Sequence, residues 1–436
     1  MRVLRISLTG IIFVAMAVSG AAAQEHQHPP ATQTTTPEQH QHEHGGAASL
    51  FSARDGSGTS WLPTNSDMYA VHSGAGRWEF MWHGNAFLQF LHESANEHRG
   101  STQTGSINWF MGMARREIGA ARIGFRTMLS LEPATVGGCG YPDLLATGEQ
   151  CDGESIHDRQ HPHDFFMELA GEYERSIRGS VRWQIYGGLA GEPALGPVAY
   201  PHRLSAMPNP LAPIGHHWLD ASHITFGVVT TGVFTPRWKA EASVFNGREP
   251  DEDRWDLDLA ALDSFSGRVS FAPTADIALQ VSAGHLNEAE AGEGSLPRVD
   301  VDRVTASVTY HRRMAAESLW ASTLAWGRNE EAGVASHALL VETSLTREQN
   351  VWFGRFEVGG KPAHDLDLHD RTDVMTVSKI QAGYTRYVTQ RGGLLLGVGG
   401  HLAAGLVPEA LEPHYGHRAN LGVGMFLTVR PAAHAR

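Results

Sequence analysis

The sequence predicts an all-β protein, a transmembrane antiparallel β-barrel of about sixteen strands, with fourteen or eighteen as neighbouring counts. Three observations predict it: an N-terminal segment typical of export, apolar side chains at every second position, and connections that alternate between short and long. After the N-terminal segment, no stretch holds the roughly 18 consecutive apolar residues of a membrane helix. The mature chain is therefore soluble, secreted or a barrel, and the strand pattern favours the barrel.

Residues 1–23 have the layout of a signal peptide. Arg2 and Arg5 supply positive charge, a mostly apolar stretch follows, and small residues end at Ala23. We expect cleavage after Ala23 and export from the cytoplasm. An uncleaved helical anchor is the alternative, but the apolar stretch is shorter than the roughly 20 residues that span a bilayer.

Residues 24–76 form a predicted periplasmic arm that is largely disordered. Its first part, QEHQHPPATQTTTPEQHQHEHGG, offers almost nothing to bury. Histidine-rich tracts bind transition metals as flexible chelators, although a solvated linker has the same composition. The histidines concerned are His26, His28, His40, His42 and His44.

The barrel is predicted over residues 77–431, followed by a tail at residues 432–436. At its start, in RWEFMWHGNAFLQFL, Trp78 and Phe80 fall on one face and Glu79 falls on the other. This period of two is typical of a β-strand and recurs to the end of the chain. The strands therefore present an apolar face and a polar face.

The connections alternate in length, which suits a barrel whose two ends face different compartments. Seven short turns and eight long loops make sixteen strands. The short ones lie around residues 117–120, 177–179, 236, 273–275, 314–316, 347–349 and 390–392. The long ones lie around residues 95–106, 136–163, 192–222, 247–264, 288–300, 328–335, 360–373 and 407–416.

With this strand pattern and signal peptide, the chain from Arg77 to Pro431 resembles the general porin class of Gram-negative outer membranes. The resemblance implies outer-membrane lipid and the barrel-assembly machinery as partners. It also implies that the third long loop, Glu192 to Ser222, folds into the lumen. Barrels of this class often end on an aromatic residue, whereas here Phe426 is followed by LTVRPAAHAR.

Sixteen strands predict a water-filled channel for small solutes or ions. The histidine-rich arm adds the hypothesis of a role in metal handling. The alternative is a plugged barrel that serves as a metal-binding or adhesion surface protein. Polar residues of mixed sign are expected on the lumen face, where they create a transverse field across the pore or simply pair and stiffen the wall. The predicted pore-lining residues are Arg122, Arg126, Glu168, Glu172, Arg182, Lys239, Glu241 and Arg268.

Two histidine-rich clusters precede strands on the same rim and are expected to face one another across the channel mouth. Imidazole and carboxylate are the usual ligands of Zn, Cu or Ni, the candidate cofactors. The same residues also suit structural hydrogen bonds within the loops, or contact with a substrate. The predicted metal ligands are His157, Asp158, His161, His163, Asp164, His216, His217, Asp220 and His223, and a third loop repeats the pattern with His369, Asp370 and Arg371.

Composition and motifs exclude some functions. A net charge of -13 argues against a nucleic-acid partner. Neither a Gly-x-Ser-x-Gly elbow nor a His-Glu-x-x-His helix occurs, so we do not expect an enzyme. The only cysteines, Cys139 and Cys151, are expected to form a loop disulfide in an oxidising compartment, which stabilises by about 3 kcal/mol.

Overall fold

The computed structural model describes residues 49–96, 98–290, 297–315, 318–368, 371 and 373–433. The predicted signal peptide, the five arm histidines, His369 and Asp370 lie outside these residues, and their roles stay predictions. Within the described part, no helix is long and apolar enough to cross a membrane.

Strands make up most of the regular structure, and the described helices are short turns of three or four residues. The strands are β1 (Val71–Ala75), β2 (Trp78–Glu93), β3 (Ser101–Ile118), β4 (Ala121–Leu129), β5 (Tyr141–Cys151), β6 (Glu154–Gln160), β7 (Phe166–Arg178), β8 (Val181–Ala190), β9 (Val228–Phe234), β10 (Trp238–Phe245), β11 (Ser264–Thr274), β12 (Ile277–Glu290), β13 (Val299–Ala315), β14 (Ser318–Glu331), β15 (Val334–Arg347), β16 (Asn350–Pro362), β17 (Val374–Arg391), β18 (Leu394–Leu406) and β19 (Ala419–Pro431). The helices are α1 (Glu132–Thr135), η1 (Tyr200–His202), α2 (His216–Leu219), η2 (Ala221–His223), η3 (His364–Leu366), η4 (Glu409–Leu411) and α3 (Glu412–Tyr415).

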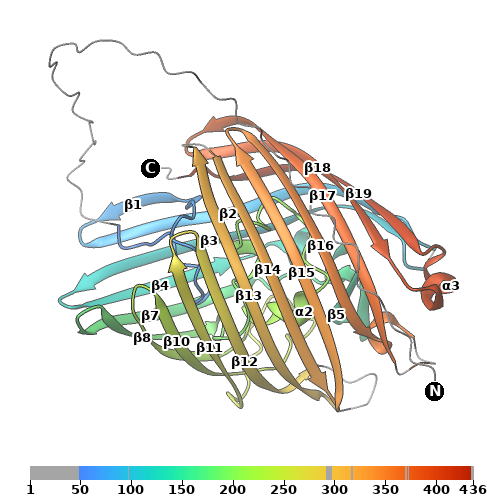
Figure 1. The fold of residues 1–436 in the computed structure, drawn as a ribbon, viewed down its shortest axis with the longest axis horizontal. Helices are drawn as coiled ribbons and strands as arrows, with labels where there is room; N and C mark the ends of the chain where they lie inside the picture. The colour runs from blue at the N-terminus through green and yellow to red at the C-terminus, as the bar shows by residue number, and fades with distance from the viewer. Residues whose placement is uncertain are drawn as a thin grey trace, which may run out of the picture. The chain divides into compact units, whose positions relative to one another are not determined.

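The strands close into one antiparallel ring (Figure 1). From β2 to β19 each strand pairs with the next in the chain, except that β4 pairs with β7 and leaves β5 and β6 as a separate hairpin. The ring closes where β19 pairs with β2, between Gly422 opposite Glu93 and Val429 opposite Ala86. The seventeen-stranded sheet includes β1, which pairs antiparallel with the first residues of β2, so the other sixteen strands form the ring. The predicted all-β class and strand number are confirmed.

Side chains alternate between the two faces of the wall, as the sequence predicts. In β15, Leu339 and Val341 point outward and are more than 40% exposed, whereas Leu340 and Glu342 point inward and are buried. Outward apolar side chains recur around the ring and would contact lipid. They include Leu88, Phe125, Val281, Trp352, Leu402 and Leu427. An apolar outer belt with a polar interior is the pattern of a transmembrane barrel.

The predicted long loop at residues 328–335 is wrong. β14 and β15 stay paired to their ends, with Glu331 opposite Val334, and a two-residue turn joins them. Ala332 and Gly333 both have positive φ, of 47° and 81°, as a tight hairpin turn requires. The run from Arg328 to Glu331 is polar because these strands reach the end of the barrel, and its polarity led to the loop prediction.

Residues 49–76 are folded against the barrel, so the predicted disordered arm extends too far along the chain. β1 pairs with β2, and Asn65 hydrogen-bonds the turn between β11 and β12 through the carbonyl of Ala275. Charged side chains of the wall hold the segment, and its own Phe51 and Ala70 also pack into a buried apolar cluster with wall residues. These contacts with the wall, which composition alone does not reveal, keep the segment ordered.

The connection between β4 and β7 folds inward as the β5–β6 hairpin. Leu144 and Leu145 pack there against Ile214, Leu366 and Tyr415, which come from three other connections. A disulfide joins Cys139 to Cys151, whose Cα atoms are 5.2 Å apart. The hairpin therefore helps to position the interior segments described below.

Candidate functional site

The connection between β8 and β9, residues 192–224, lies inside the barrel, and we name it the lumen segment. Most of its residues are buried, in agreement with the inward loop that the porin resemblance implies. It hydrogen-bonds strands on the other side of the ring. These bonds join Ser205 Oγ to Thr323 Oγ1 at 2.8 Å, Asn209 Nδ2 to Gln381 Oε1 at 2.6 Å, the Gly215 N–H to Glu357 Oε1 at 3.1 Å, and Trp218 Nε1 to Ser336 Oγ at 2.7 Å.

A buried ion network anchors the lumen segment to the wall. Arg203 Nη1 lies 2.5 Å from Asp220 Oδ2 within the segment, and Arg203 Nε lies 2.7 Å from Glu342 Oε1 on β15. The other oxygen of Glu342 pairs with Arg355 on β16 at 3.2 Å. Burial alone would raise the pKa of Asp220, but Arg203 and His216 hold it well below its usual value. The network is therefore charged, and it ties the two parts of the chain together.

A second interior segment comes from the start of the described chain. Residues 49–66, which we name the N-terminal inner segment, accept hydrogen bonds from wall cations. Arg126 donates to the carbonyl of Gly58, and Arg268 donates to Thr59 Oγ1 at 3.0 Å. The two interior segments also meet, because the Ala199 N–H donates to Ser57 Oγ at 2.8 Å. Together they occupy much of the space inside the ring.

The predicted pore-lining residues mostly pair across neighbouring strands. Arg126 lies 3.1 Å from Glu168, and Arg268 lies 3.2 Å from Glu241, which also pairs with Lys239 at 3.4 Å. The remaining pairs are Arg115 with Glu172, and both Arg122 and Arg182 with Glu174. The pairing agrees with the stiffened-wall alternative, and a role in solute passage stays a prediction.

Sequence reasoning missed charged residues on the later strands. Arg203, Glu342, Arg355, Glu357 and Lys379 are all buried inside the barrel. Those on β15 to β17 follow the period-two pattern that identified the earlier set, so the same pattern would have found them. Arg203 has no such signal, because it lies outside the strands and its wall partner Glu342 is 139 residues away in the sequence.

The two predicted histidine clusters meet in space. The ring of His161 lies 5.8 Å from that of His216 and 5.6 Å from that of His217, measured between centroids. His223 lies 5.1 Å from His216 and 5.3 Å from His163. The expectation that the clusters face one another agrees with the structure, although metal ligation by them stays a prediction.

Each clustered imidazole has its Nδ1 near a carboxylate or carbonyl oxygen. The partner atoms belong to Glu149 for His161, Glu132 for His163, Asp220 for His216, Glu249 for His217, and the Asp220 carbonyl for His223. Such contacts fix ring orientation and tautomer, as they do around metal ligands. The Nε2 atoms of His161, His217 and His223 are buried and have no hydrogen-bond partner among the described residues.

Other members of the predicted metal set have structural partners. Asp158 pairs with Arg99 at 2.8 Å, and Asp164 lies 3.7 Å from Arg254. His163 contacts Tyr200 through its second nitrogen at 3.0 Å. His157 lies 3.7 Å from Asp367, away from the buried cluster. These contacts favour the alternative that these four residues organise the loops.

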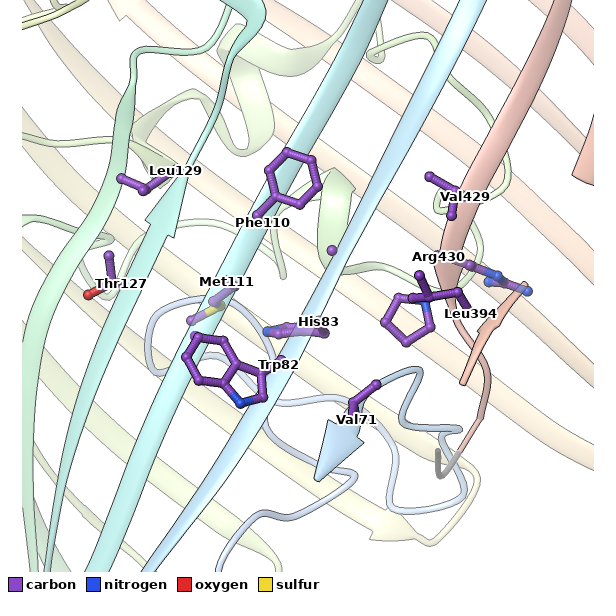
Figure 2. A pocket seen from close by; sticks show the side chains of 13 residues that line it. Val71, Trp82, His83, Phe110, Met111, Thr127, Leu129, Leu394, Val429 and Arg430 are labelled. Atoms are coloured by element: carbon purple, nitrogen blue, oxygen red, sulfur yellow. The ribbon is translucent and has the colours of Figure 1, made fainter. Parts of the chain in front are cut away.

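An apolar hollow of about 450 Å³ lies at the seam where β2 meets β19 (Figure 2). The β19 pairing ends at Ala86 and the β1 pairing begins at Trp82, so this edge of β2 has a gap in its ladder. Gly84 and Gly112 have no side chain to fill the space. Trp82 and Phe110 line the hollow and are exposed on the outer wall, so we attribute it to lipid contact rather than to the lumen site.

Acidic pH is expected to weaken the attachment of the lumen segment to the barrel wall, because His202 of this segment is held in its neutral form. Burial, and then the charges of His83 and Arg126, lower the pKa of His202 well below 6.5. A histidine with a depressed pKa stabilises the fold fully above about pH 6.5, and this contribution falls by up to about 1.4 kcal/mol per pH unit below it. The free energy of unfolding should therefore fall between pH 7.5 and pH 5.

The variant His202→Gln should take up about one proton fewer on unfolding at acidic pH. Its free energy of unfolding should therefore fall less between pH 7.5 and pH 5 than that of the wild type. Its stability is compared with the wild type at pH 7.5, where the imidazole is neutral in both states, and again at pH 5. Urea unfolding followed by tryptophan fluorescence measures both values. Parallel curves for the two proteins would show that another group carries the acid sensitivity.

Comparisons with known proteins find similarity only among solved structures. No protein-family model matches the chain, and no curated protein matches it. Salmonella typhi OmpF in complex with daunomycin is 10% identical with a TM-score of 0.49, over 82% of this chain and all of that chain. OmpT of Vibrio cholerae is 7% identical with a TM-score of 0.46, over 82% and 99%. The outer membrane channel DcaP of Acinetobacter baumannii is 8% identical with a TM-score of 0.45, over 83% and 100%.

The class of the protein follows from its own geometry. A closed antiparallel ring with an even number of strands, an apolar outer belt and a polar interior defines a transmembrane β-barrel of the outer-membrane type. Within that class, sixteen strands and a connection folded into the lumen make its architecture porin-like.

Proposed function

We propose that this barrel is an outer-membrane channel for small solutes or ions, and that its two interior segments set the aperture. The observation that carries the proposal is the polar, ion-paired inner face of a closed sixteen-strand ring. Porins of this strand number enclose an aqueous channel. Outer-membrane lipid, the assembly machinery and the solute would be its partners.

The contacts that hold the two interior segments to the wall would allow a segment to move away from it. These contacts include many side-chain hydrogen bonds and ion pairs, such as Ser205 with Thr323 and Arg203 with Glu342. Water and polar solutes can replace such contacts, whereas the strand ladder itself has no comparable substitute in lipid. Movement of a segment would therefore change the opening and leave the barrel intact. The mixed charges behind it would favour dipolar or ionic solutes.

A second candidate is a plugged barrel that serves as a metal-binding surface protein without conducting. The burial of Arg203 and Glu342, which are at most 1% exposed, favours it, because these side chains lie inside a filled interior. The histidine cluster gives either candidate a route to metal handling, with metal ions as cargo or as bound ligands. A measurement of ion conduction distinguishes the channel from the plugged barrel.

Purified protein in planar lipid bilayers tests the channel. We expect small, discrete conductance steps in the wild type, because both interior segments narrow the lumen. Folding is checked beforehand by the heat-modifiable migration typical of barrels, and heat-denatured protein serves as the control. A folded barrel without steps, even after removal of the lumen segment, would favour the plugged candidate.

A further inference from the structure

We propose that His217, Glu249 and Glu290 form a binding site for one divalent first-row transition-metal ion, which links the lumen segment to the long connections at one rim of the barrel. The three residues come from separate parts of the chain: α2, the connection between β10 and β11, and the end of β12. Each offers one ligand atom, and these atoms lie within 4.8 Å of one another. The inference goes beyond the proposed channel, since a barrel that does not conduct could hold the same ion.

The spacing of the first two ligands suits a shared ion. His217 Nδ1 lies 3.0 Å from Glu249 Oε1. Two atoms that bind one ion with bonds of about 2.1 Å lie about 3.0 Å apart at a right angle and about 3.4 Å apart at a tetrahedral angle. The ring would bind through Nδ1 as the tautomer that keeps its proton on Nε2. The proton that lies between Nδ1 and Glu249 in the ion-free protein would therefore leave Nδ1, and the neutral ring would carry its one proton on Nε2.

A small cavity beside the ligands has room for the ion. Its volume is about 30 Å³, and its lining includes Glu249, Glu290, Ser222 and Arg303. A space of this size holds a water molecule or a small ion. Ser222 is 7% exposed, and its Oγ is buried with no hydrogen-bond partner among the described residues. A buried hydroxyl without a partner costs free energy, and an ion or its bound water would supply the partner.

The charges around the cavity favour a divalent cation. Glu290 is near the carboxylates of Glu331 and Glu249, with Asp365 further contributing, and Arg303 is the cation that opposes them. The cavity lining carries three carboxyl groups, those of Glu149, Glu249 and Glu290, and two guanidiniums, those of Arg248 and Arg303, so acidic groups outnumber basic ones. Like charges held together in a buried place are costly unless a cation neutralises them.

Packing fixes the position of the His217 imidazole before an ion binds. A Cβ on Gly148 would lie 2.2 Å from the His217 ring, so the ring packs directly on the glycine backbone. The ring of His216 lies 5.5 Å away on another side. A ligand fixed by packing loses little freedom when it binds. One nitrogen and two carboxylate oxygens suit Zn²⁺ and related ions, whereas Ca²⁺ requires six to eight oxygen ligands.

Zinc binding to the full folded chain tests the site. The protein is stripped with a chelator and titrated with Zn²⁺ by calorimetry, with bound metal measured by mass spectrometry. The main variant is Glu249→Gln, because its side chain is partly exposed and the amide retains its size. We expect at least tenfold weaker binding at one site. Glu252→Gln, an exposed carboxylate in the same connection, is the matched control and should bind as the wild type does.

Both variants retain the N-terminal histidines, so background binding by those residues is common to all samples. A second measurement is the unfolding temperature, which Zn²⁺ should raise in the wild type and in Glu252→Gln, and much less in Glu249→Gln. Equal affinity and equal stabilisation in all three proteins would overturn the site. Because neither readout needs conduction, a failed metal site and a failed channel are distinguishable.

Discussion

Replacement of residues 192–224 by an Asn-Gly turn is expected to raise the single-channel conductance several-fold while the barrel still folds. The design is possible because β8 and β9 remain paired beyond their ends: Gly191 and Thr225 exchange hydrogen bonds of 3.0 and 2.9 Å. A two-residue turn can therefore join them. The segment's removal also frees the N-terminal inner segment from its contact at Ser57, which would open the lumen further.

Planar-bilayer recordings measure the effect. A matched control removes residues 259–261 from the connection between β10 and β11, where all three side chains are exposed, and its conductance should equal that of the wild type. An unchanged conductance in the first variant would mean that the lumen segment does not set the aperture. Removal of residues 49–66 as well then tests whether the N-terminal inner segment is the main obstruction.

Replacement of Arg203 by alanine is expected to destabilise the lumen segment by about 3–5 kcal/mol, the usual cost of breaking a buried ion pair. The change leaves Asp220 without its nearest cation, and Glu342 retains only Arg355. The cost should appear first as local opening, since the strand ladder is untouched. Hydrogen exchange within residues 192–224 should accelerate, and the conductance should rise.

Two further variants test whether the effect of Arg203→Ala comes from the buried ion network. Arg237→Ala removes an exposed arginine at the turn between β9 and β10 and should change stability by less than about 0.5 kcal/mol. Asp220→Asn added to Arg203→Ala should recover part of the loss, because it removes the buried carboxylate that has lost its nearest cation. If Arg203→Ala behaves like Arg237→Ala, the ion network does not hold the segment.

The strands could be predicted from the sequence because their signal is local and repeated. In β2 and β15, outward apolar residues alternate with inward residues. This period of two arises because one face of each strand contacts lipid and the other face contacts the polar interior. The prediction failed where a strand leaves the hydrocarbon layer. At Arg328 to Glu331 both faces are polar, and a strand there has the composition of a loop.

The interior could be predicted only in part. The two histidine clusters were visible because they are dense, and their common rim suggested that they meet. The Glu249 and Glu290 ligands were not visible, since each is one carboxylate among many in its connection. Their proximity to His217 depends on how three distant parts of the chain pack.

The sequence by itself determined the barrel, its apolar outer belt and its strand number, and the porin resemblance added the inward course of residues 192–222. Only the tertiary structure decided that residues 49–66 enter the barrel, that Arg203 joins Asp220 to Glu342, and that the histidines have carboxylate partners. The reason is physical. In a membrane barrel, each strand residue faces either lipid or the interior, so the residue types along a strand alternate in a pattern that the sequence shows. An interior segment is held by single contacts between residues far apart in the chain, and such contacts leave no periodic pattern.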